Sequence, residues 1–247
     1  MSTLSKTAAR SLFLALFLLA GWPQGSAGGG SLADRWISGL KEIDQLLRSQ
    51  QWQTAAERSQ KIADQIVTTG GPDANVAYTL AVVSVFRALA EKGRGDSDAA
   101  TWYCDIALAL VPEIGKTDLK PYGTLGAGIK EELLRSQSSL KSPMEAGQTA
   151  EERRKDVTPP VIRHQVKPVY PAGLRQMGVA GRVIAETIID VDGRLKRCRV
   201  LEARGGGPAM TYAALDALRQ WRFDPARRDG QPVKVYYVLT INFKFRG

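Results

Sequence analysis

Apolar residues recur at helical spacing through the first half of the chain. From Leu32 onward they return every three or four positions, which is the period of a helix with one buried face. Residues 70–72 (Gly-Gly-Pro) and 93–95 (Gly-Arg-Gly) interrupt this pattern as helix breakers. We expect helices starting at Leu32, over residues 54–69 and 75–92, from Asp96 or Ser97 to just before Pro112, and over residues 128–138. The first half therefore predicts an all-α helical domain over residues 31–139.

The last third of the chain changes to an alternating pattern. Apolar and polar residues alternate strictly over residues 233–245, as in a half-buried strand. We expect three strands, over residues 182–191, 195–203 and 233–245. Asp192-Gly193 predicts a tight turn between the first two, and helices are expected after Pro171 and Pro208. This pattern predicts an α+β domain over residues 169–247, with a three-stranded antiparallel sheet and two helices.

Residues 140–168 separate the two patterns. They contain Pro143, Pro159, Pro160 and Pro168 together with the charged run at residues 151–156. Proline and charge favour an extended and solvated segment. We therefore expect a multidomain chain in which residues 140–168 are a linker and the two flanking parts fold independently.

The helical part has a weak resemblance to tetratricopeptide repeats. Its small residues match the spacing in the second helix of such a unit at Ala100, Cys104, Ala107 and Pro112. Ala56 and Ala63 repeat two of these positions. A generic helical bundle explains the pattern equally well, because two repeats are fewer than a solenoid normally needs. Both alternatives stay open.

The N-terminus has the layout of a secretory signal. Lys6 and Arg10 precede a short apolar run, and small residues follow at 25–27. We expect residues 1–27 to be a signal peptide that is cleaved after Ala27, which gives a periplasmic product. The alternative is an uncleaved, single-pass anchor in the inner membrane, although a spanning helix needs about 20 mostly apolar residues.

The formal net charge of +9 is concentrated near the C-terminus. From Pro171 onward there are fourteen Lys or Arg residues against seven Asp or Glu residues. Such a surface suits acidic partners, and the export signal argues against nucleic acid as one of them. Cys104 and Cys198 lie far apart, and we interpret them as small core residues, with an interdomain disulfide as the alternative.

No residue pattern indicates catalysis. The single histidine, His164, lies in the expected linker, and no cluster has the spacing of metal ligands. Residues 205–207 are glycines, but Pro208 follows them and lacks the N–H that a phosphate site would use. The sequence therefore predicts no catalytic residue, no metal site and no cofactor.

Four short motifs in the C-terminal part occur in an informative order. They are Tyr170-Pro171, Asp192-Gly193, Trp221-x-Phe223-x-Pro225 and Gly230-x-Pro232-Val233. This order and spacing resembles the C-terminal domain of TonB-type proteins, which are periplasmic modules that bind partners by strand addition. The resemblance covers about a third of the chain. The glutamine that the family has three residues before the tyrosine is replaced here by Lys167.

The resemblance also implies where partners bind. The last strand would be the sheet edge that pairs with a short receptor segment, and the residues before the Tyr-Pro pair would contact the receptor. The implied partner-binding residues are Lys167, Pro168, Tyr170, Lys234, Tyr236, Val238, Thr240 and Asn242. The alternative is that the linker or a second copy of the domain covers this edge.

We therefore expect a periplasmic adaptor that binds a protein partner in the cell envelope through β-strand addition. The partner would be an outer-membrane receptor or an envelope complex, and a homodimer stays open. The alternative is a TonB-type energy transducer, which the N-terminal segment retains in the inner membrane and which couples the proton motive force to outer-membrane transport. Membrane association follows only if that segment is uncleaved.

Overall fold

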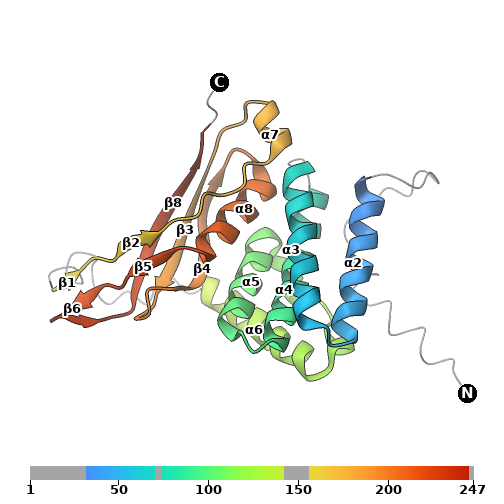
Figure 1. Cartoon of the computed structure of the whole chain (residues 1–247), viewed down its shortest axis with the longest axis horizontal. Helices are drawn as coiled ribbons and strands as arrows, with labels where there is room; N and C mark the ends of the chain where they lie inside the picture. Colours follow the sequence, from blue (N-terminus) through green and yellow to red (C-terminus); the bar gives the residue numbers. More distant parts are fainter. Residues whose placement is uncertain (1–31, 70–73, 142–155, 245–247) are drawn as a thin grey trace, which may run out of the picture.

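The computed structural model describes residues 32–69, 74–141 and 156–244. Figure 1 shows a helical half (residues 32–141) beside a sheet domain (residues 156–244). The helical first half and the antiparallel sheet of the second are as predicted from the sequence. The expected signal peptide and the larger part of the expected linker lie outside the described residues.

The helical half is built from helices that pack against their neighbours in the chain. Its elements are α2 (Leu32–Arg48), α3 (Trp52–Thr69), α4 (Ala74–Gly93), α5 (Ser97–Leu110), the 3-10 turns η2 (Pro112–Lys116) and η3 (Lys120–Tyr122), and α6 (Gly123–Lys141). Asp96 caps α5, since its carboxylate accepts a hydrogen bond from the Ala99 N–H at 2.9 Å. The last helix begins five residues earlier than the sequence predicts. The resemblance to tetratricopeptide hairpins stays a prediction.

The core of the helical half lies around α4 and α5. Phe86 and Leu89 on α4 are fully buried, as are Trp102 and Ile106 on α5. The apolar stripe of α2, predicted from its helical spacing, is buried from Trp36 through Leu47. The apolar pattern therefore identified the buried faces correctly.

The sheet domain has one main antiparallel sheet and two helices beside it. Its longer elements are α7 (Ala172–Gln176), β3 (Gly181–Ile189), β4 (Leu195–Arg204), α8 (Gly207–Arg219) and β8 (Val235–Phe243). The strand order is β4-β3-β8, with β3 in the centre. The turn between β3 and β4 contains Gly193 at φ 74°, a left-handed conformation that glycine adopts without strain.

Short strands add two further ladders to this domain. They are β1 (Val157–Thr158), β2 (Val161–His164), β5 (Arg222–Asp224), β6 (Arg227–Arg228) and β7 (Gln231–Pro232), in the orders β1-β6-β7 and β2-β5. Residues 157–164 fall within the expected linker, and in the structure they include the short, mostly exposed strands β1 and β2. Their β-branched residues pair with residues 222–228 on either side of Pro159-Pro160, so this segment belongs to the sheet domain.

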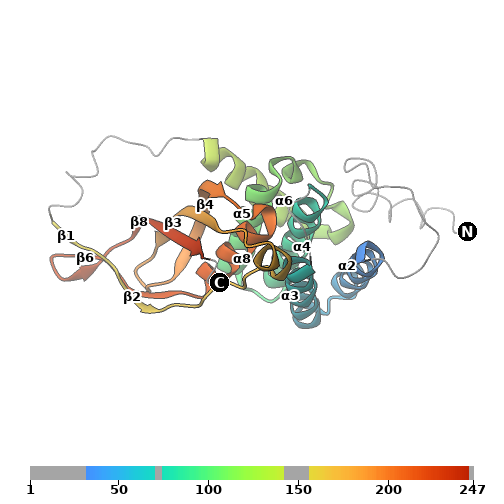
Figure 2. The same cartoon turned by 90° about the horizontal axis from the view of Figure 1, so that it is seen from above.

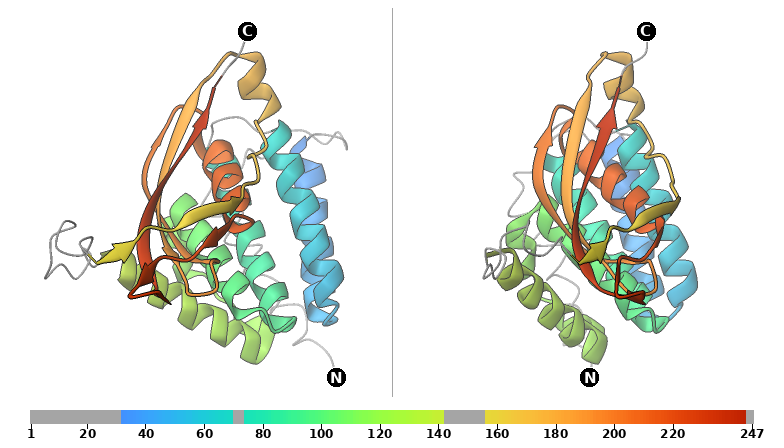
Figure 3. Two further views of the ribbon diagram at one scale, coloured as in Figure 1. Left: turned by 60° about the vertical axis from the view of Figure 1, so that its left-hand side comes forward. Right: turned by 90° about the vertical axis from the view of Figure 1, so that its left-hand side faces the viewer.

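Helix α8 lies between the main sheet and the helical half, and Figures 2 and 3 show the three layers from different sides. It packs against β3 and β4 on one side and against α3, α4 and α5 on the other. Leu215 is fully buried, and its carbonyl accepts a hydrogen bond from the Trp102 indole N–H at 3.2 Å. One buried cluster contains apolar residues from both parts of the chain.

An ion pair crosses the same interface beside β4. The Arg197 guanidinium donates two hydrogen bonds to the Asp105 carboxylate, at 2.8 and 2.9 Å, and one to the Ser136 hydroxyl at 2.9 Å. Lys196 and Arg219 bind acidic residues of the helical half in the same way. The facing surfaces of the two parts therefore share both apolar and charged contacts, and the independent folding of each part stays a prediction.

Candidate partner-binding site

Strand β8 forms one edge of the main sheet. It pairs along its whole length with β3, from Val235 opposite Ile189 to Phe243 opposite Gly181. Within the described residues, no other strand pairs with β8. The expected edge strand is therefore present, with its free side available for hydrogen bonds.

The other edge of the sheet is occupied by the helical half. Residues of α5 lie against β4, and the Cys198 N–H donates a hydrogen bond to the Asp105 carboxylate at 3.0 Å. That N–H points away from β3, so a side chain of α5 uses one of the hydrogen-bond donors that an added strand would need. The pKa of Asp105 is raised because burial disfavours its charged form, although Arg197 opposes this effect.

The side chains of β8 alternate between the core and solvent. Leu239, Ile241 and Phe243 are buried, whereas Tyr236 is 60 % exposed and Val238 is 53 % exposed. This is the alternation that the sequence predicts. The exposed residues are large and apolar for a solvent face, which is a common property of interaction surfaces.

The backbone N–H and C=O groups of β8 point alternately toward β3 and toward the free side of the strand. The Thr187 hydroxyl on β3 donates to the Tyr237 carbonyl at 3.1 Å, which places this carbonyl on the β3 side. Backbone groups alternate along an antiparallel strand, so the N–H and C=O groups of Tyr236 and Val238 are expected to point toward the free side. These are the groups that strand addition uses.

A second segment faces part of this edge. Residues 165–170 run from β2 to α7 without regular secondary structure. The Trp221 indole N–H donates to the Val166 carbonyl at 2.9 Å, and the Tyr170 hydroxyl donates to the Val179 carbonyl at 2.7 Å. The Tyr170 ring also packs edge-on against Phe243, with ring centroids 5.6 Å apart. These contacts hold the segment beside the end of β8.

The space between the two walls is a groove of about 710 Å³, which we call the β8 groove. It is lined by Gln165, Lys167, Pro168, Tyr170, Arg175, Trp221, Thr240, Ile241, Asn242, Phe243 and Lys244. Lys167, Pro168, Tyr170, Thr240 and Asn242 were expected at the site, and the structure brings them together here. The other expected residues lie toward the start of the same strand, outside the groove, and they are Lys234, Tyr236 and Val238.

Sequence reasoning missed several residues of the β8 groove. Trp221 was interpreted as a core residue, and it is buried, but its edge also forms part of the groove wall. Arg175 comes from α7 and Lys244 from the end of β8, and no motif marks either of them. The excess of basic residues after Pro171 was the available signal, although it could not say which of them lie together.

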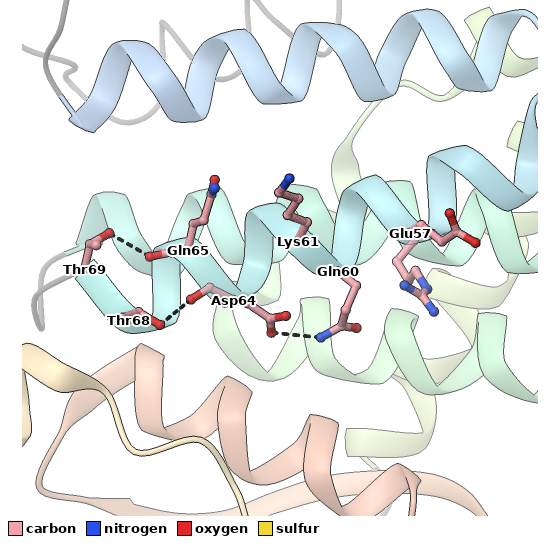
Figure 4. A pocket seen from close by; sticks show the side chains of 8 residues that line it. Glu57, Gln60, Lys61, Asp64, Gln65, Thr68 and Thr69 are labelled. Atoms are coloured by element: carbon pink, nitrogen blue, oxygen red, sulfur yellow. Dashed lines mark hydrogen bonds between the residues drawn. The ribbon is translucent and has the colours of Figure 1, made fainter.

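A second cavity, of about 640 Å³, lies along α3 and is shown in Figure 4. Its labelled side chains point in different directions from α3, and most already have partners. The Gln60 amide donates to Asp64 at 3.0 Å and to Asp216 at 3.2 Å, and Thr68 bonds its own helix. Asp216 also accepts a hydrogen bond from the Tyr103 hydroxyl at 3.1 Å, so it belongs to the interface, and burial raises its pKa. The polar side chains around this cavity therefore do not point toward a common binding position.

The described part of the chain has neither a metal-binding cluster nor a membrane-spanning helix. In residues 32–69, 74–141 and 156–244, no three His, Cys, Asp or Glu side chains are grouped so that they could hold a metal ion. None of the helices there is both long and apolar enough to cross a membrane. Both cysteines are free and buried, as expected for core residues.

Comparison with known proteins identifies the sheet domain. Residues 166–245 match the family described as Gram-negative bacterial TonB protein C-terminal. A relative named Protein TonB, from Vibrio cholerae serotype O1, is 35 % identical over 89 residues, which are 36 % of this chain and 36 % of that protein. Protein TonB of Yersinia enterocolitica is 36 % identical over 93 residues, which are 36 % of this chain and 32 % of that protein.

The chain thus spans about a third of the length of the curated relatives it matches. The match confirms the resemblance that the four motifs indicated. It covers the sheet domain from residue 166 onward, without β1 and β2, and it includes every residue of the β8 groove except Gln165.

Proposed function

We propose, because residues 166–245 form a TonB C-terminal domain, that this protein binds a protein partner of the cell envelope by strand addition to β8. The observation that carries the proposal is the free edge of β8 beside the β8 groove. An extended partner segment would continue the sheet, with β8 on one side and residues 165–170 on the other. The partner would be an outer-membrane receptor.

Backbone hydrogen bonds supply most of the affinity in this mode of binding. The exposed groups of Tyr236 and Val238 would pair with the first part of the segment, and the β8 groove would hold the rest. Thr240 and Asn242 present polar side chains along its wall. Side chains in the groove therefore tune which segment fits, whereas the edge itself accepts any extended chain.

The two relatives favour an energy transducer over the adaptor that we placed first. Both carry the name Protein TonB, and each matches 36 % of this chain. A transducer must stay attached to the inner membrane, whereas an adaptor is released by cleavage after Ala27. Cell fractionation with N-terminal sequencing separates them: the intact N-terminus in washed inner membranes supports the transducer, and a soluble product starting after Ala27 supports the adaptor.

Strand addition itself is tested by Val238→Pro. Proline removes the outward N–H of this position and fixes φ, and an edge strand tolerates this better than a central one. We expect Val238→Pro to fold, by circular dichroism, and to lose capture of its partner from outer-membrane extract. Val238→Ala is the matched control, because it removes the same side chain and keeps the N–H. A folded Val238→Pro protein that binds as well as Val238→Ala would refute strand addition at β8.

We also infer the domain division from these contacts. Residues 32–141 and 156–244 are two structural parts, and residues 142–155 are the connection between them. Limited proteolysis should cut first at Arg153, Arg154 or Lys155. Cuts inside either part before the connection would argue against this division.

A further inference from the structure

A narrow ribbon of paired strands projects from the sheet domain, and we call it the basic ribbon. Residues 157–164 pair in it with residues 222–228, through β1 with β6 and β2 with β5. Figures 1 and 2 show β1 and β6 at the end of the molecule away from the helical half. Asp224 is the one acidic residue of the ribbon, and Asp156 and Asp229 lie just beyond its tip. Its four arginines are Arg163, Arg222, Arg227 and Arg228.

Most of this positive charge has no acidic partner in the protein. Arg163 binds the Asp224 carboxylate at 2.5 Å. Within the described residues, Arg222, Arg227 and Arg228 form no ion pair with any Asp or Glu. All three are exposed. The ribbon therefore presents three guanidinium groups whose charge is available to a ligand from outside the chain.

The fold also places like charges against one another at the base of the ribbon. Arg222 lies directly opposite Arg194 across two chain segments. Like charges in directly opposite positions are destabilising. Burial lowers the pKa of Arg222, and the neighbouring charges of Arg194 and Arg219 lower it further. A bound anion would relieve this repulsion.

The side chains of the ribbon indicate which anion fits. Every basic residue of the ribbon other than His164 is an arginine, whose planar guanidinium matches two phosphate oxygens at once. On the same ribbon, Val161 is 59 % exposed and Ile162 is 46 % exposed. Basic residues beside exposed apolar residues are typical of surfaces that bind the headgroup layer of anionic membranes. An acidic protein would explain the charge alone, whereas phospholipid explains the arginines and the apolar residues together.

We propose that the basic ribbon docks the sheet domain on an anionic phospholipid surface. Arg222, Arg227 and Arg228 bind headgroup phosphates. Val161 and Ile162 contact the boundary between the headgroups and the acyl chains. None of these five residues lines the β8 groove, so the inference does not rest on strand addition to β8. The sheet domain would hold a membrane with one surface and a protein partner with another.

Co-sedimentation with lipid vesicles tests this docking. The protein is the mature chain expected after cleavage, residues 28–247, because the preceding segment would add its own membrane affinity. Vesicles of equal parts phosphatidylglycerol and phosphatidylcholine are compared with vesicles of phosphatidylcholine alone. We expect binding to the anionic vesicles only, and this binding should weaken as added salt screens the charges.

Neutralising two arginines then locates the contact. One arginine near an anionic surface contributes about fivefold in affinity, so Arg227→Gln with Arg228→Gln should weaken vesicle binding about 25-fold. The matched control is Arg35→Gln with Arg135→Gln, which removes the same net charge from exposed positions of the helical half. The control should leave vesicle binding nearly unchanged. Circular dichroism confirms that each variant is folded.

Several outcomes would overturn the inference. Equal weakening by the two double variants would show that only the net charge of the chain matters. Equal binding to both kinds of vesicle, or binding to neither, would exclude recognition of anionic lipid. If polyglutamate binds through Arg227 and Arg228 while anionic vesicles do not, the ribbon recognises an acidic protein instead. Val238→Pro should leave vesicle binding unchanged, which separates this inference from strand addition.

Discussion

Removing the positive charge of Arg197 should weaken the whole fold, because it leaves Asp105 buried without its main partner. Arg197→Met is the informative change, since methionine keeps much of the side-chain packing and removes the guanidinium. The Asp105 side chain is only 1 % exposed, and without Arg197 it would keep only neutral partners, the Cys198 N–H and the Ser136 hydroxyl.

The expected cost is about 3 kcal/mol in the free energy of unfolding. Breaking one side of a buried ion pair costs about 3–5 kcal/mol, and the lower end applies because Arg197 is 27 % exposed and water can enter. For a chain of this length, that cost lowers Tm by about 6–12 °C. Thermal unfolding followed by circular dichroism measures this shift. Arg163→Met is the control. The ion pair between Arg163 and Asp224 is exposed to solvent, so it contributes little to the free energy of unfolding.

The pH dependence gives an independent check. Burial already raises the pKa of Asp105, and removing Arg197 raises it further. A carboxyl with a raised pKa in the folded state stabilises the fold at low pH, and this stability is lost as pH rises through that pKa. The deficit of Arg197→Met should therefore be larger at pH 8 than at pH 5. A deficit equal to that of Arg163→Met, or one that does not change with pH, would refute the reasoning.

Three further changes test other parts of the structure. Gly193→Ala should destabilise the protein more than Gly230→Ala in urea unfolding. Both glycines have positive φ, but only at Gly193 would the added Cβ meet the Phe223 carbonyl. Equal effects of the two changes would contradict this. Asp96→Ala should cost about 1 kcal/mol through loss of the α5 cap, and no change in the urea midpoint would argue against the cap. Trp221→Phe removes the bond to Val166 and should weaken partner capture while the fold survives; unchanged capture would show that this groove wall is not needed.

Local patterns in the sequence predicted most of the elements. The breaks at Gly70 and Gly93 separate real helices, and Asp192-Gly193 forms the expected turn between β3 and β4. These features depend on residues close together in the chain, where glycine conformation and side-chain periodicity decide the structure. The same is true of the alternation in β8.

Contacts between distant residues could not be predicted in the same way. Arg197 and Asp105 are separated by 92 residues, and Trp102 and Leu215 by 113 residues. One signal was available, because Asp105 is a charge within an otherwise apolar stretch of α5. A buried acid needs a basic partner, and here Arg197 of the sheet domain supplies it. The motif resemblance located the edge and the residues before Tyr170, but not Arg175 and Lys244, which also line the β8 groove.

The helical half changes what the sheet can bind. A three-stranded sheet has two edges, and unpaired edges recruit strands without selection. Here α5 lies against the first part of β4, and Asp105 uses the outward N–H of Cys198. The rest of that edge, residues 199–204, ends in the charged Arg204, and charged side chains disfavour pairing at an exposed edge. In the described part of the chain, β8 is therefore the edge left for a partner. Under the proposed strand addition to β8, the contact with the helical half would contribute to selectivity, because it occupies part of the competing edge.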